Sequence, residues 1–105
     1  MIQRTIQAQL QKLAKMYPVV TITGPRQSGK TTLAKMTFPD YRYVSLENFD
    51  VRQMAEADPK GFLKSYAPPV IFDEIQRVPA LLSYIQTIVD ENKTCGQYIL
   101  TGSHQ

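Results

Sequence analysis

Apolar residues near the start of the chain recur at the spacing of an amphipathic helix. Over residues 2–15 they are separated by four, four, three and one positions, which places them on one helical face. These residues are Ile2, Ile6, Leu10, Leu13 and Ala14. Because proline cannot donate to a helical hydrogen-bond ladder, Pro18 is expected to end this helix.

Short apolar and β-branched runs then alternate with helical patterns along the rest of the chain. The runs predict four strands, at Val19–Thr23, Tyr41–Leu46, Val70–Phe72 and Tyr98–Leu100. Every residue of the third run is apolar, as is typical of a strand buried on both faces. Alternating strands and helices predict an α/β fold with a parallel sheet.

The helices between these strands have recognisable start signals. One is expected from Lys30 to about Phe38, and another over roughly Val51–Ala57 with Asn48 or Asp50 as its cap. Two more begin at prolines, a residue type favoured in the first helical turn. These prolines are Pro59, which follows Asp58, and Pro79.

The composition is that of one soluble globular domain, with 105 residues of which 43% are hydrophobic and 20% charged. No apolar run reaches the ~18 residues of a membrane-spanning helix, and residues 1–16 are too polar for a signal peptide. The single cysteine, Cys95, excludes an intramolecular disulfide and fits a reducing compartment, so we expect a cytoplasmic protein with no membrane partner. A net charge of +3 is weak support for a nucleic-acid partner.

The turn after the first expected strand carries a phosphate-binding pattern. Residues 24–31 fit G-x-x-x-x-G-K-[ST], with a strand before them and a helix after them. The glycines let successive N–H groups face one anion, the helix start adds its dipole, and Lys30 adds a charge that reaches the β- and γ-phosphates. Arg26 and Gln27 are given no individual role. The predicted nucleotide-binding residues are Gly24, Pro25, Arg26, Gln27, Ser28, Gly29, Lys30, Thr31 and Thr32.

Two acidic residues follow the third expected strand, where an α/β sheet places its ligand chemistry. Asp73 is the natural partner of Mg²⁺, alongside the hydroxyl of Thr31. Glu74 lies one residue further on and can orient the attacking water or accept its proton. Alone, an Asp-Glu pair would indicate a solvated loop; 43 positions after a phosphate-binding lysine, it indicates metal binding and catalysis.

Small polar residues end the fourth expected strand and predict a turn over Thr101–Ser103. In a parallel sheet this end faces the same crevice as the phosphate-binding loop. Thr101 or Ser103 could therefore hydrogen-bond the γ-phosphate or the attacking water.

Two further stretches match the format of guanine-nucleotide motifs. Residues 58–61 read D-x-x-G, but they follow a helical segment, so Asp58 is interpreted as a helix cap. Residues 92–94 begin N-K-x-D, yet Cys95 stands where the carboxylate is needed. Specificity for guanine is therefore not supported.

Three stretches in combination, residues 23–33, 70–79 and 100–103, resemble the prokaryotic AAA+-type ATPases that carry a C-terminal domain of unknown function. The stretch Asp-Glu-Ile-Gln-Arg-Val-Pro at 73–79 is the most particular to this branch. Residues 43–47 and 58–63 are also similar to the family, so the resemblance covers nearly the whole chain.

The resemblance implies a P-loop three-layer sandwich that binds ATP with Mg²⁺ and hydrolyses it to ADP. Residues 24–32 would be Walker A, Asp73 the Walker B magnesium residue, Glu74 the catalytic base and Ser103 the sensor-1 residue, with Lys30 also catalytic. The fourth strand would lie between the first and the third. Residues 1–105 would form a partial domain, truncated before a fifth strand, without lid or C-terminal domain, and weakly active or inactive. The open edge of the first strand could then bind another copy of the chain.

Two other function classes stay open at this point. One is a P-loop kinase that transfers the γ-phosphate to a small acceptor, although a water-polarising Glu74 argues against it. The other is a nucleotide-switched module that binds protein or nucleic acid. The basic residues Arg4, Lys12 and Lys15 of the first helix usually indicate a solvated face rather than a DNA site.

Overall fold

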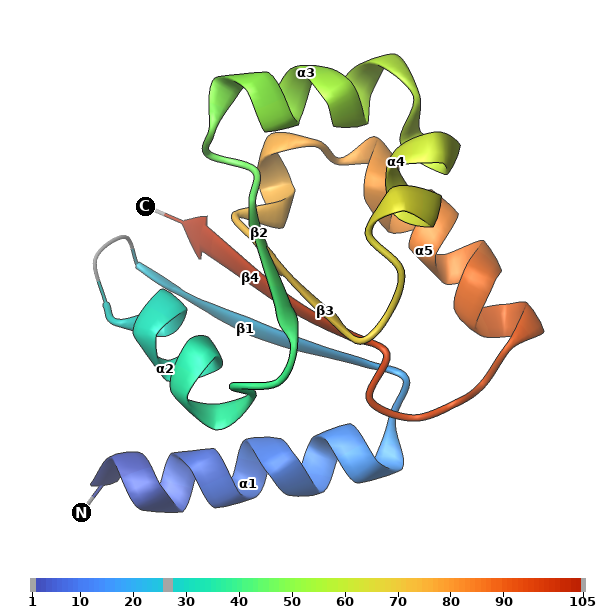
Figure 1. Ribbon diagram of the computed structural model, residues 1–105. Coiled ribbons are helices and arrows are strands. Elements are labelled where there is room, and N and C mark those ends of the chain that lie inside the picture. Colours follow the sequence, from blue (N-terminus) through green and yellow to red (C-terminus); the bar gives the residue numbers. More distant parts are fainter. Residues whose placement is uncertain (1, 26–27, 105) are drawn as a thin grey trace.

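The computed structural model describes residues 2–25 and 28–104 (Figure 1). Helices and strands alternate along the chain as the apolar pattern predicts. The helices are α1 (Ile2–Met16), α2 (Lys30–Thr37), α3 (Phe49–Ala57), α4 (Pro59–Ser65) and α5 (Ala80–Glu91), with a 3₁₀ turn η1 (Ile75–Arg77). The strands are β1 (Val19–Pro25), β2 (Arg42–Ser45), β3 (Val70–Asp73) and β4 (Tyr98–His104).

The four strands form one parallel sheet in the order β1-β4-β3-β2. β4 therefore lies between β1 and β3, as the resemblance to P-loop ATPases implies, and the fold is of the P-loop NTPase type. Within the described residues, β1 and β2 are the two edges of the sheet. Opposite Leu100 on β4 lie Thr21 of β1 and Phe72 of β3, so the carboxyl ends of these strands meet at one edge of the molecule.

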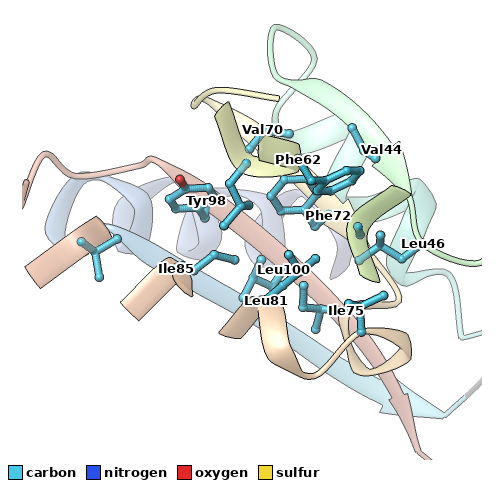
Figure 2. Close-up of a cluster of buried hydrophobic side chains, with 14 residues drawn as sticks. Val44, Leu46, Phe62, Val70, Phe72, Ile75, Leu81, Ile85, Tyr98 and Leu100 are labelled. Carbon is cyan, nitrogen blue, oxygen red and sulfur yellow. The ribbon is translucent and has the colours of Figure 1, made fainter. Parts of the chain in front are cut away.

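Helices cover both faces of the sheet and give the molecule three layers (Figure 1). α3, α4 and α5 cover one face, where Phe72 and Leu100 point into the larger core drawn in Figure 2. α1 and α2 cover the other face, where Ile71 and Ile99 pack with Ala34. Neighbouring residues of β3 thus enter opposite cores. This is why the third apolar run has no polar position before Asp73.

Side-chain caps fix the starts of α3 and α4. The Asn48 carboxamide oxygen accepts a hydrogen bond from the N–H of Val51 at 3.2 Å, so Asn48 rather than Asp50 caps α3. The Asp58 carboxylate accepts from the N–H of Gly61 at 3.1 Å. The capping role confirms the structural interpretation of the D-x-x-G match.

The carboxyl ends of β1 and β4 differ from the prediction. β1 continues through Pro25, two residues beyond the expected strand, and β4 continues through His104, so the turn predicted over Thr101–Ser103 is wrong. Pairing explains both differences, because Gly24 lies opposite Ser103 in a continuous parallel register. No helix within residues 2–25 and 28–104 is long and apolar enough to cross a bilayer.

Candidate functional site

The start of α2 with the two residues before it, the segment after β2, and the carboxyl ends of β3 and β4 surround a cavity of about 420 Å³. The residues that line it come from four separate parts of the chain, and all except Gly29 have polar side chains. They are Ser28, Gly29, Lys30, Thr31, Thr32, Glu47, Asp73, Glu74 and Ser103. Sequence reasoning predicted eight of these nine residues, and Glu47 is the addition. The predicted residues Arg26 and Gln27 lie outside the described part of the chain.

The backbone at the start of α2 is arranged to receive an anion. Gly29, at the N-cap position, has φ +85°, a left-handed conformation that glycine adopts without steric cost. Because Gly29 has no side chain, it offers no cap to the N–H groups of the first turn. Residues Lys30, Thr31 and Thr32 form this first turn and line the cavity. The helix dipole favours a negative charge at the same place.

The Lys30 ammonium lies in this cavity and is almost buried, with 7% of the residue exposed. Its Nζ donates to the Pro25 carbonyl oxygen at 2.8 Å, to Ser103 Oγ at 3.0 Å and to Ser28 Oγ at 3.5 Å. Within the described residues these acceptors are all neutral oxygens. A buried cation whose direct acceptors are neutral is costly, so an anion in contact with the ammonium would be favoured. Ser103 Oγ links this ammonium to the Glu74 carboxylate.

Asp73 ends β3 and is the centre of a cluster of hydroxyl groups. Its Oδ1 accepts hydrogen bonds from Thr31 Oγ1 at 2.9 Å and from Thr101 Oγ1. Its Oδ2 accepts from the Tyr43 hydroxyl at 2.8 Å. The residue is 5% exposed. The predicted pair of Thr31 and Asp73 therefore lies in direct contact, although 42 positions separate the two residues in the chain.

Glu74 turns out of the sheet in a strained conformation, with φ 60° and ψ 51°. A non-glycine residue in this left-handed region costs about 1–2 kcal/mol, and such residues cluster at functional sites. Ser103 Oγ donates to Glu74 Oε2 at 2.8 Å, and Gln76 Nε2 donates to Glu74 Oε1. Both carboxylate oxygens are therefore held, on the side of the cavity that contains Lys30.

The two hydroxyl candidates on β4 have different surroundings. Ser103 lines the cavity and contacts both Lys30 and Glu74. Thr101 is 0% exposed, and its hydroxyl also accepts the Glu74 N–H at 3.1 Å. Thr101 is thus engaged with the protein itself, which leaves Ser103 as the residue able to meet a ligand.

Glu47, which lines the cavity, forms an ion pair with Arg77. Arg77 Nη2 lies 3.4 Å from Glu47 Oε2, which joins the segment after β3 to the segment after β2. No role was predicted for Arg77 from the sequence. In the structure its contact with Glu47 holds two segments of the chain together. The Nε of Arg77 is buried and has no hydrogen-bond partner within the described residues.

The Tyr43 phenol is held in its protonated form by its surroundings. Burial, followed by the hydrogen bond to Asp73 and the charge of that carboxylate, raises the pKa of Tyr43 to about 12. At neutral pH the hydroxyl is therefore a dependable donor to Asp73. Lys35 Nζ lies over the Tyr43 ring, 4.0 Å from its centroid.

The family relationship follows from a comparison with known proteins. A family model described as an AAA domain matches residues 16–105, most of the chain. The chain belongs to the AAA domain family. This AAA domain therefore falls, at a coarse level, among nucleotide-binding proteins of the ATPase type, in agreement with the fold and with the anion-attracting cavity.

The AAA domain also matches uncharacterized proteins of Mycobacterium bovis and Mycobacterium tuberculosis. Each is 31% identical over 104 residues. The match covers 96% of this chain and 23% of each relative, so the chain spans about a quarter of their length.

Two contacts of this AAA domain were missed by sequence reasoning. Tyr43 lies on the same face of β2 as Ser45, which pairs with Asp73, so strand alternation was a usable signal once the register was known. Gln76 falls in the stretch that carried the resemblance, but its contact with Glu74 depends on η1, which no sequence pattern predicted.

Proposed function

We propose that this AAA domain binds ATP with Mg²⁺ and that the full-length protein hydrolyses it. The observation that carries the proposal is the nearly buried Lys30 ammonium, held by neutral oxygens beside the uncapped start of α2. A triphosphate would place negative charge in direct contact with this ammonium and accept the N–H groups of the first helical turn. Residues 24–32 would form the cradle, as the sequence pattern predicts.

The donor set also fits a magnesium ion. Mg²⁺ prefers oxygen ligands and is commonly held by one or two protein groups together with substrate phosphates. Thr31 and Asp73 offer such a pair beside the phosphate cradle. When bound, the ion would neutralise negative charge on the phosphates. Within the described residues, no three carboxylate, imidazole or thiol side chains gather to hold a metal without a ligand.

Glu74 is proposed as the general base. Its carboxylate would accept a proton from the water that attacks the γ-phosphorus, while the bond from phosphorus to the leaving oxygen of ADP breaks. Ser103 and Gln76 hold the two carboxylate oxygens and fix their direction. Lys30 would neutralise charge on the β- and γ-phosphates, and Ser103 would sense the γ-phosphate from β4.

The finer family position is part of the same proposal. The stretch at residues 73–79 supports the branch of AAA+-type ATPases with a C-terminal domain of unknown function. A cytoplasmic location of the protein is also part of the proposal. Residues 1–105 would then be the phosphate-binding part of a larger protein.

Nucleotide binding is tested with a fluorescent ATP analogue titrated in the presence of Mg²⁺. Lys30→Ala should weaken binding at least tenfold, because it removes the buried charge that faces the phosphates. Lys64→Ala is the matched control, since Lys64 is an exposed lysine on α4, on the opposite face of the sheet. Equal affinities for the Lys30→Ala variant and the unchanged domain would overturn the proposal.

Hydrolysis is tested separately in the full-length protein by measuring phosphate release. Glu74→Gln should keep nucleotide binding and lose release, whereas the control Glu91→Gln, an exposed position at the end of α5, should behave as the parent protein. Unchanged release from the Glu74→Gln variant would exclude Glu74 as the base. Transfer of phosphate to a small acceptor in place of release would favour a kinase.

A further inference from the structure

Three hydroxyl groups from three different elements meet at Asp73. Thr31 of α2 and Thr101 of β4 both donate to Oδ1. Tyr43 of β2 donates to Oδ2 at 2.8 Å and is the donor to that oxygen within the described residues. A carboxylate can rotate about its bond to Cβ, and donors on both oxygens oppose that rotation. The two threonines hold only Oδ1, so the Tyr43 hydroxyl is needed to hold Oδ2 and restrain rotation of the carboxylate.

The Tyr43 side chain is itself well supported. Its ring packs against the core between the sheet and α2, and Lys35 Nζ lies 4.0 Å from its centroid. A tyrosine has few rotatable bonds, so a packed ring holds its hydroxyl in place at little entropic cost. Because Tyr43 does not line the cavity, it would act on a ligand through Asp73.

We propose that Tyr43 is a positioning residue that raises the affinity of this site for the magnesium complex of a nucleotide by fixing the Asp73 carboxylate. The inference rests on the proposed nucleotide function. Groups that hydrogen-bond a metal ligand orient it before the metal arrives, and their removal commonly costs 10–100-fold in metal affinity. Nucleotide binding without a divalent ion does not use Asp73, so it should not depend on Tyr43.

The test compares two affinities for a fluorescent ADP analogue, one in excess Mg²⁺ and one in EDTA. Tyr43→Phe keeps the ring and removes the hydroxyl. We expect it to lower the ratio of the two affinities about tenfold, with the value in EDTA unchanged. The matched control is Tyr41→Phe, which removes a hydroxyl that donates to the Gly96 carbonyl oxygen at 2.7 Å, at the opposite end of the sheet. This control should leave both affinities unchanged.

A structural role for Tyr43 predicts a different result. If Tyr43→Phe weakened binding equally in Mg²⁺ and in EDTA, or changed neither affinity, the inference would be overturned. The double variant Tyr43→Phe with Asp73→Asn provides a second measurement, because an effect transmitted through Asp73 should vanish when that carboxylate is absent. A further loss of Mg²⁺ dependence in the double variant would also contradict the inference.

The same titrations separate the two proposals. If the unchanged domain bound no nucleotide in either condition, the proposed function would fail, and the inference with it. If the unchanged domain showed Mg²⁺-dependent binding that Tyr43→Phe did not alter, only the role of Tyr43 would be lost.

Discussion

The buried hydroxyl of Thr101 connects the two acidic residues of the candidate site. It donates to Asp73 Oδ1 and accepts the N–H of Glu74 at 3.1 Å, and the residue is 0% exposed. Thr101→Val replaces the hydroxyl with a methyl group of nearly the same shape. The substitution therefore removes two hydrogen bonds without leaving a cavity, and we expect the domain to lose stability.

The size of the loss can be worked from these contacts. A hydrogen bond to a charged acceptor contributes about 1.5–3 kcal/mol, and a buried N–H without an acceptor, as at Glu74, costs about 1–3 kcal/mol. The added methyl group offsets roughly 0.8 kcal/mol. The net loss should be about 3 kcal/mol, a large part of the ~5–15 kcal/mol that stabilises a typical domain. For a domain of this size it would lower Tm by about 12–24 °C.

Thr37→Val is the matched control for this measurement. Thr37 is 3% exposed, and its Oγ1 is buried with no hydrogen-bond partner within the described residues. The same chemical change at Thr37 should therefore be neutral or stabilising by up to about 1 kcal/mol. Thr101→Ser provides a second comparison, because it keeps the hydroxyl and removes only the methyl group.

Urea unfolding, followed by far-ultraviolet circular dichroism, gives the free energy of unfolding of each variant. The expected order of stability places Thr101→Val last, below Thr101→Ser and well below Thr37→Val. A Thr101→Val domain within about 0.5 kcal/mol of the unchanged protein, or equal to the Thr37→Val domain, would refute the assigned hydrogen bonds.

Two further predictions concern a helix cap and an alkaline transition. Asp58→Ala should destabilise the domain by about 1 kcal/mol, because α4 loses its N-cap, whereas Asp58→Asn should keep most of that stability in the same urea assay. Burial raises the pKa of Tyr98 above its ordinary value of 10.0, so the unfolded chain releases this proton at lower pH than the folded domain does. Stability should consequently fall as pH rises above about 10, and it should fall less steeply in a Tyr98→Phe variant; parallel pH profiles would contradict this assignment.

Much of the fold could be predicted because local signals and burial agree. The third strand is apolar at every position before Asp73, and the structure buries it between two helical layers. Asp58 and Pro59 predicted the start of α4 because a cap and a first-turn proline act within a few residues. The phosphate-binding pattern similarly placed Lys30 at the beginning of α2.

The remaining features depend on partners that are distant in the sequence. Thr101–Ser103 has the composition of a turn, yet it is a strand because β1 continues beside it as far as Pro25. Tertiary pairing overrides local propensity here. The left-handed backbone of Glu74 has no sequence signal, since glycine would be the residue expected there. The contact between Tyr43 and Asp73 required the register of β2 and β3, which the pattern alone does not specify.

The position of β4 has a consequence for the order of events in folding. This strand is the last of the described strands in the chain but lies inside the sheet, where Val19 pairs with Tyr98. As the chain leaves the ribosome, β1 has to wait until Tyr98, the partner of Val19, has been made before its neighbour exists, and pairing across so long a loop is slow. Lys30 and Ser103, which meet across this pairing, would be brought together late. A nascent chain should therefore gain its anion-attracting cavity only when β4 has emerged.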